Sequence, residues 1–276
     1  MTKSRESANE AIKQIEAGVL NAFESENYQN YLRTMAKFHK YSAGNQILIW
    51  TQKPDATRVA AFGTWKKMGR YVKGGEKGIR IIAPSFVNVD KLVTHADGTQ
   101  EVVKVKIPFY KPVYVFDVSQ TEGEELPTIA RMANYDIDNY ESLIQIIKKV
   151  AEIPVTFEDI VGTARGYYSP SENKIVLKAG MAQSETVSVL IHELGHSVMH
   201  KNDSGKTRNS EEVEAESVAF VVSNYLGLDT GTSSFEYIAN WSTGKEVKEL
   251  KASLDVISKT SQEIIDKIEK EFGNEV

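Results

Sequence analysis

Apolar residues recur every three or four positions near both ends of the chain, which is the spacing of one face of an α-helix. This pattern predicts helices at residues 8–25 and 27–40, and a long helix at 247–272. The same spacing predicts helices at 140–150, 184–200 and 209–226, the last ended by Gly227. The short apolar run at 46–51 fits a strand or a helix equally well.

Between residues 57 and 118 the pattern changes to short runs rich in β-branched and aromatic residues. Val103, Val105 and Ile107 alternate with Lys104 and Lys106, as expected for a strand with two different faces. The sequence Asp97-Gly98 predicts a hairpin turn. Strands are predicted here at 58–62, 78–83, 86–89, 101–107 and 113–118, and later at 155–157 and 174–177.

An acidic stretch with glycine and proline at 119–128 separates these two patterns, and we interpret it as a domain linker. A chain of 276 residues is long enough for two domains. We therefore predict an α+β protein with two domains. The first, residues 1–122, combines helices with a small β-sheet, and the second, residues 130–276, ends in the long helix.

Composition excludes several classes of protein. With 41% hydrophobic and 26% charged residues the chain is globular, and without cysteine it has no disulfide, thiolate metal site or cysteine nucleophile. A net charge of -5 argues against a wholly basic nucleic-acid binder. The amino-terminal segment lacks the apolar core of a signal peptide, and the apolar runs are too short to cross a bilayer, so we expect a cytoplasmic protein with no membrane partner.

The strongest chemical signal is the sequence His-Glu-x-x-His at residues 192–196. Four residues advance a helix by slightly more than one turn, so His192 and His196 share a face and can bind one ion. Glu193 lies beside them, where a carboxylate can accept a proton from a metal-bound water. Val187, Leu190 and Leu194 supply the apolar side of this helix. We therefore predict one zinc ion bound by His192 and His196, with Glu193 as the catalytic base.

A catalytic zinc needs a third protein ligand. His200 is one turn beyond His196, too far along the helix to reach the same ion. On the next predicted helix, Glu212 and Glu216 share a face, whereas Glu214 points nearly opposite. One of this pair is expected to bind the metal and the other to orient a ligand histidine. Two histidines and one glutamate also accept Mn²⁺ or Co²⁺.

His192-Glu193-x-x-His196 followed by Glu212-x-x-Ala215-Glu216 resembles the gluzincin metallopeptidases. The resemblance implies that Glu212 is the third ligand and Glu216 the orienting residue, with the reverse assignment still open. Residues 166–177 are similar to the edge strand that lies along the substrate in that fold.

Four segments of the first half resemble the N-terminal domain of the ArdC antirestriction family. They are 41–46 (Tyr-Ser-Ala-Gly-Asn-Gln), 62–65 (Phe-Gly-Thr-Trp), 72–79 (Val-Lys-Gly-Gly-Glu-Lys-Gly-Ile) and 113–121 (Val-Tyr-Val-Phe-Asp-Val-Ser-Gln-Thr). The resemblance implies a single-stranded-DNA-binding domain followed by a gluzincin-like metallopeptidase domain, in a protein carried by conjugative plasmids and related mobile elements that protects incoming DNA from restriction.

The composition of residues 58–80 agrees with a nucleic-acid partner, because the segment contains seven basic residues and one acidic residue, a local charge of +6. Single strands are bound by basic grooves with aromatic faces on which bases stack. The alternative is a solvated basic surface over a small core in which Trp65 is simply buried. The candidate DNA-binding residues are Arg58, Trp65, Lys66, Lys67, Arg70, Tyr71, Lys73, Lys77 and Arg80.

Three functions remain in competition. In the first, an antirestriction-type protein binds single-stranded DNA and carries a zinc metallopeptidase domain, with a protein as a further partner. The second is a regulatory metalloprotease that cleaves a repressor or a defence protein, localised by its DNA domain. In the third, the metal is structural and the protein shields DNA without catalysis.

Overall fold

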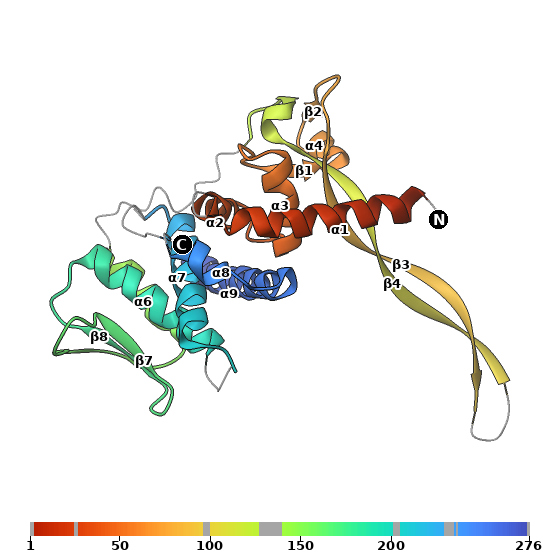
Figure 1. Ribbon diagram of the computed structural model, residues 1–276. Helices are drawn as coiled ribbons and strands as arrows, with labels where there is room; N and C mark the ends of the chain where they lie inside the picture. The colour runs from red at the N-terminus through yellow and green to blue at the C-terminus, as the bar shows by residue number, and fades with distance from the viewer. Residues whose placement is uncertain are drawn as a thin grey trace. The chain divides into compact units, whose positions relative to one another are not determined.

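The computed structural model describes residues 3–24, 27–95, 100–126, 140–200, 205–228, 235 and 237–274. The fold is α+β and divides into two compact units (Figure 1). The N-terminal unit comprises residues 1–17 and 48–124, and the C-terminal unit comprises 18–47 and 125–276. This division passes through α1 (Lys3–Ala22) and α3 (Ala43–Gln52), so residues 18–47 group with the second half of the chain. The ambiguous run at 46–51 is helical and belongs to α3.

Two long strands dominate the N-terminal unit. β3 (Ile79–Thr94) and β4 (Gln100–Asp117) form an antiparallel ribbon, and β1 (Val59–Ala61) pairs with the end of β4. The runs predicted separately at 78–83 and 86–89 are one strand, as are those at 101–107 and 113–118, because the antiparallel pairing of β3 with β4 continues without a gap through the residues between them. Phe62 begins the short helix α4 (Phe62–Lys67) and does not extend β1. The predicted Asp97-Gly98 turn lies outside the described residues.

The end of β4 turns a corner that is held by Asp117. The buried carboxylate of Asp117 accepts hydrogen bonds from the backbone N–H groups of Thr57, Arg58 and Ser119. Gln120 completes the corner, since its side chain accepts from the Asp117 N–H and donates to Glu76 and to the Lys77 carbonyl. Much of the segment 113–121 therefore serves as a structural joint.

Part of the predicted linker at 119–128 is wrong. Val118–Gln120 forms a 3-10 helix (η1), and Thr121–Gly123 forms β5, which pairs with β2 (Arg70–Val72). β5 was not predicted because it lies in an acidic stretch and has only three residues, too few for an alternation of apolar and polar residues to be recognised. Residues 127 and 128 lie outside the described residues.

The C-terminal unit packs helices around a small mixed sheet. Its strands are β6 (Val155–Glu158), β7 (Gly166–Ser169) and β8 (Lys174–Lys178), in the order β6-β8-β7. The segment 166–177, expected as one edge strand, is a hairpin of β7 and β8, and of these two strands only β7 lies at an edge of the sheet. The helices are α2 (Tyr28–Lys37), α5 (Tyr140–Ala151), α6 (Gln183–Met199), α7 (Arg208–Tyr225), α8 (Ile238–Ser242) and α9 (Val247–Asn274).

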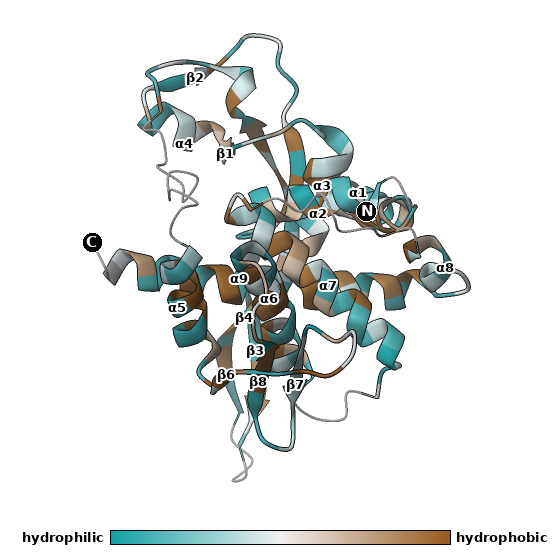
Figure 2. Cartoon of the chain, turned by 90° about the vertical axis from the view of Figure 1, so that its left-hand side faces the viewer, coloured by the Kyte–Doolittle hydropathy of each residue, from teal (hydrophilic) through white to brown (hydrophobic). Residues whose placement is uncertain are grey.

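The core of this unit surrounds α6 and α7, whose apolar residues appear as brown stripes in Figure 2. Leu190 and Ile191 of α6, and Val213 and Val218 of α7, are fully buried. Each such side chain stabilises the fold by about 1.5–3 kcal/mol. The apolar stripe of α9 packs against α7, so it is not an open surface. None of the described helices combines the length and apolar character needed to span a bilayer.

Candidate metal centre

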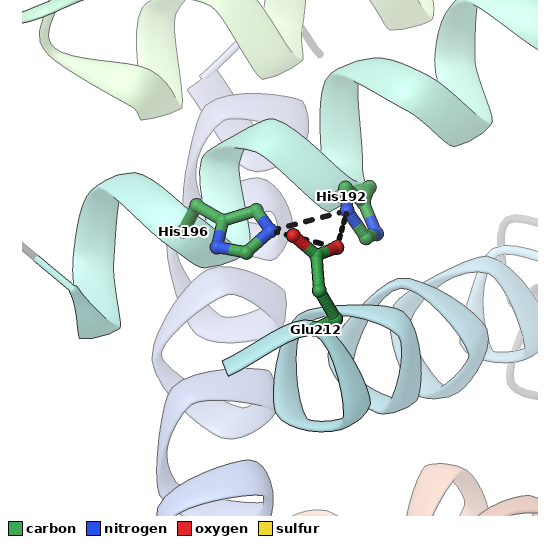
Figure 3. A group of neighbouring side chains, drawn as sticks. All are labelled: His192, His196 and Glu212. Atoms are coloured by element: carbon green, nitrogen blue, oxygen red, sulfur yellow. Dashed lines mark hydrogen bonds and ion pairs between the residues drawn. The ribbon is translucent and has the colours of Figure 1, made fainter. Parts of the chain in front are cut away.

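Three side chains from two helices converge on one point in the C-terminal unit (Figure 3). His192 and His196 project from α6, and Glu212 projects from the first turns of α7. The Nε2 atoms of His192 and His196 are 3.2 Å apart. The Oε2 atom of Glu212 lies 3.5 Å from the first and 3.6 Å from the second. The structure thus brings together the three residues predicted as metal ligands.

This triangle matches the size that a tetrahedral ion requires. Ligand atoms bound at roughly 2.0–2.1 Å around a tetrahedral ion are about 3.3 Å from one another. The three observed separations are 3.2, 3.5 and 3.6 Å. Two imidazoles and a carboxylate are also a donor set found in catalytic zinc sites, so the residues present fit a divalent metal.

The charges in the cluster are strongly coupled. Burial alone would lower the pKa of His192, but the carboxylates of Glu212 and Glu193 raise it above its ordinary value. Hydrogen bonds from the two imidazoles hold the pKa of Glu212 far below its ordinary value. Glu212 is therefore a carboxylate at neutral pH, ready to bind a cation.

Glu193 lies next to the cluster and is buried. Burial raises the pKa of the Glu193 carboxyl, although the two histidines and a backbone hydrogen bond from Tyr168 oppose this effect. Glu193 lines a cleft of about 530 Å³ together with the three cluster residues. Gly166, Tyr167 and Tyr168 of the edge strand β7 also line this cleft. An extended chain placed along β7 would pass the carboxylate and the cluster.

Sequence reasoning missed a chain of hydrogen bonds behind His196. The Nδ1 atom of His196 is 3.0 Å from Nδ1 of His200, whose Nε2 is 3.4 Å from Glu214. Glu214 is buried and also accepts from Lys206 at 2.7 Å and from Ser253 at 3.0 Å. If neutral His196 donates its Nδ1 proton to His200, its Nε2 atom keeps a lone pair that can bind a cation. The repeat of histidine at four-residue spacing was the available signal.

Glu216, the alternative ligand, lies outside the cluster. Its carboxylate accepts a hydrogen bond from the Tyr237 hydroxyl, and no group of ligand atoms includes it among the described residues. Glu214, predicted to point nearly opposite to Glu212, contacts a different set of residues and reaches the hydrogen-bond network behind His196. The geometry therefore favours Glu212 over Glu216 as the residue that faces both histidines.

A second group of metal-type side chains, His39, Asp266 and Glu269, also has its ligand atoms within 4.8 Å of one another. Glu269, however, already forms an ion pair with Lys40 at 3.1 Å and accepts a hydrogen bond from Tyr225. The protein thus supplies its own cation at that position, whereas Glu212 faces two imidazoles. We therefore place the candidate centre at His192, His196 and Glu212.

The predicted DNA-binding residues of the N-terminal unit separate into two sets. Trp65 is fully buried and donates its indole N–H to the Phe116 carbonyl. Its ring is therefore not accessible for stacking with a base, and the prediction of Trp65 as a DNA-binding residue is wrong. Arg70 is bound to Thr121, Gly123 and Glu124 along β5. The set that remains at the surface comprises Lys66, Lys67, Tyr71, Lys73 and Lys77.

Arg58 and Arg80 are half-buried. Arg80 is paired with Glu10 at 2.8 Å and donates to Gln14. Even in the exposed set, Lys73 donates to the Ser119 carbonyl. Much of the local charge of this segment is therefore used inside the unit, which composition alone did not reveal.

Comparison with known proteins agrees with this architecture. Residues 3–116 match the family model for the N-terminal domain of anti-restriction factor ArdC. The crystal structure of the antirestriction ArdC protein from the R388 plasmid in its metal-free form covers 83% of both chains, with 20% identity and a TM-score of 0.52. The match to the ArdC family thus covers the N-terminal part of the chain, and the likeness to the R388 protein shows a shared fold.

Residues 113–223, which contain the metal cluster, match the family described as "Putative metallopeptidase family (DUF6782)". A Mn(II)-bound structure of the R388 protein is 18% identical and has a TM-score of 0.53, covering 83% of this chain and 84% of that one. A curated Bacillus anthracis protein, "Uncharacterized protein pXO2-81", is 29% identical over an alignment of 314 residues that covers 98% of this chain. The chain spans 53% of the length of that relative.

Proposed function

We propose that this protein is an antirestriction-type factor that binds single-stranded DNA through its N-terminal unit and carries a metallopeptidase centre in its C-terminal unit. The observation that carries the proposal is the convergence of His192, His196 and Glu212 beside the buried Glu193. The match of residues 3–116 to the ArdC N-terminal domain supports the DNA-binding part, together with the exposed lysines of that unit.

In this proposal, Nε2 of His192, Nε2 of His196 and a carboxylate oxygen of Glu212 hold one divalent ion, which we propose to be zinc. When bound, the ion polarises a peptide carbonyl and lowers the pKa of a water molecule. Glu193 accepts the proton of that water and passes it to the leaving amine. The raised pKa of Glu193 suits both proton transfers, because a pKa closer to neutral pH lets the carboxyl both accept and release a proton.

The edge strand β7 positions the substrate. Its residues line the same cleft as Glu193, and an edge strand offers unpaired backbone groups to an extended peptide. His200 and Glu214 orient His196 from behind, and thereby keep its Nε2 lone pair directed at the ion.

The test combines metal content with proteolysis in purified full-length protein. Wild type is expected to contain one zinc ion per chain and His192→Ala none, measured by plasma mass spectrometry. Glu193→Gln is expected to keep the metal and to lose cleavage of a mixed peptide library. A His192→Ala protein that retains the metal would overturn the site, and a Glu193→Gln protein that still cleaves would overturn the mechanism.

The antirestriction role is tested separately in recipient cells that carry a restriction system. Expression of wild type is expected to raise the yield of incoming unmodified plasmid. If Glu193→Gln protects the plasmid as well as wild type, then the centre is not used for protection and DNA binding alone accounts for it.

A further inference from the structure

The ribbon formed by β3 and β4 has two faces that its register defines. Residues pair in antiparallel register from Ile79 with Val115 to Thr94 with Gln100, and residues opposite one another share a face. Beyond the first few pairs, most side chains on both faces are exposed. Figure 1 shows this part of the ribbon as a twisted arm extending beyond β1 and α4 of its own unit.

One face carries three exposed aromatic rings. The exposed fractions are 64% for Phe86, 67% for Tyr110 and 55% for Tyr114. Phe86 lies opposite Pro108, and Tyr110 lies opposite Pro84. The two rings are therefore diagonal neighbours across the strands, at roughly 7–8 Å between their backbones. Tyr114 follows Tyr110 along β4 on the same face, with Pro112 between them.

Lysines continue this face toward the end of the ribbon. Lys106 lies opposite Asn88, and Lys104 lies opposite Asp90. Both lysines are exposed. The aromatic face thus places two cationic side chains directly beyond its rings.

The opposite face differs in kind, because its central pairs are Val87 with Ile107 and Val89 with Val105. It carries one exposed ring, Phe109, against three on the aromatic face, and its exposed lysines, Lys111 and Lys91, are separated from each other by these aliphatic pairs. Rings and ammonium groups in sequence are the chemistry that single-stranded nucleic acid recognises, since bases stack on the rings and phosphates pair with the cations. The aliphatic pairs in the centre of the opposite face offer neither interaction, so only the aromatic face presents several rings followed directly by cations.

We propose that the aromatic face, defined by Phe86, Tyr110, Tyr114, Lys104 and Lys106, is a binding surface for single-stranded DNA. The inference rests on the proposed DNA-binding function and assigns base stacking to these rings, in the place of the buried Trp65. The exposed lysines at 66, 67, 73 and 77 contact phosphates on the same unit.

The experiment measures the affinity of full-length protein for a fluorescently labelled oligothymidylate by anisotropy. Phe86→Ala and Tyr110→Ala are each expected to weaken binding by about 5- to 160-fold, the range for loss of one stacked base. Tyr110→Trp keeps a stacking face and is expected to bind as wild type does. Phe109→Ala is the matched control, because it removes a ring from the adjacent position on the other face. Unchanged melting temperatures are expected, since all three side chains are exposed.

The outcomes separate the alternatives. Wild type that does not bind the oligonucleotide would overturn both the proposed function and this inference. Wild type that binds, with Phe86→Ala and Tyr110→Ala binding equally well, would overturn this inference alone. An equal loss in Phe109→Ala would also overturn it, because the effect would not belong to one face. A loss that accompanies a change from dimer to monomer in light scattering would assign the ribbon to self-association instead.

Discussion

The metal cluster and the basic segment at 58–80 were both predicted as sites. In the structure the predicted metal ligands lie together, whereas several residues of the basic segment are bound or buried within their own unit. His192, His196 and Glu212 lie on regular helices whose other faces are buried, so their positions follow from the helical repeat. In the basic segment, Arg70 and Arg80 are bound within their own unit and Trp65 is in its core. The spacing of a motif on a helix predicts which side chains lie together in the fold. A count of charges in a segment does not predict which of them remain free at the surface.

The largest expected effect is on the cluster itself. Glu212→Gln removes an anionic ligand and is expected to weaken metal binding by more than about 100-fold, beyond the 10–100-fold typical of residues that only orient ligands. Metal affinity is measured by competition with a chromogenic chelator. Glu216→Gln is the matched control, expected to lose less than about 10-fold because Tyr237 holds that carboxylate outside the cluster. The reverse ranking would restore Glu216 as the ligand.

Substitution of Asp117 tests whether the segment 113–121, which resembles part of the ArdC N-terminal domain, stabilises the corner at the end of β4. Burial alone would raise the pKa of its carboxyl, but hydrogen bonds from Ser119, Arg58 and Thr57 hold the pKa below its ordinary value. Asp117→Asn is expected to lower the free energy of unfolding by about 2–3 kcal/mol, because backbone donors lose a charged acceptor. Urea denaturation measures this difference, with the exposed Asp90→Asn as control.

The same residue gives a prediction for pH. A lowered native pKa means that the stabilisation is present above the unfolded value of about 4 and is lost as the pH falls through the native pKa. The stability difference between wild type and Asp117→Asn should therefore shrink below about pH 4. A difference that stays constant down to the native pKa would show that the ionised carboxylate contributes nothing.

Glu214→Gln examines the hydrogen-bond network behind His196. Loss of the negative charge frees His200 to reorient, and metal affinity is expected to fall by about 10- to 100-fold. Glu249→Gln, on α9 and paired with Lys245 just before that helix, is expected to leave the affinity unchanged. Because Lys206 also loses its partner, affinity is measured at a temperature where both variants are folded. An affinity equal to that of wild type would restrict Glu214 to a structural role.

The smallest effect concerns the exposed lysines. Changing Lys66 and Lys67 together to alanine is expected to weaken single-strand binding a few-fold and to flatten the dependence of log K on log salt by about 0.7 for each phosphate that the protein no longer neutralises. Arg70→Ala is expected to reduce stability and leave the salt slope unchanged, because its guanidinium is bound to β5. A flatter slope in Arg70→Ala would return that residue to the DNA surface.

Sequence alone was sufficient where a repeat extended over many residues. The helical spacing at 247–272 predicted α9, and the spacing of His192 and His196 predicted a shared face, because an α-helix places residues by periodicity and needs no distant partner. The choice between Glu212 and Glu216 could not be made this way, since both lie on one face of α7 and only the packing of α6 against α7 distinguishes them.

Tertiary structure alone decided the features that depend on residues far apart in the chain. β5 has three residues and exists because β2, about fifty positions earlier, pairs with it. His200 and Glu214 meet Ser253 across three helices, and the two rings at 86 and 110 share a face only through the register of the ribbon. Local periodicity determines which face of a helix or strand a residue occupies. Only the packing and pairing of segments far apart in the chain determine which residues that face contacts.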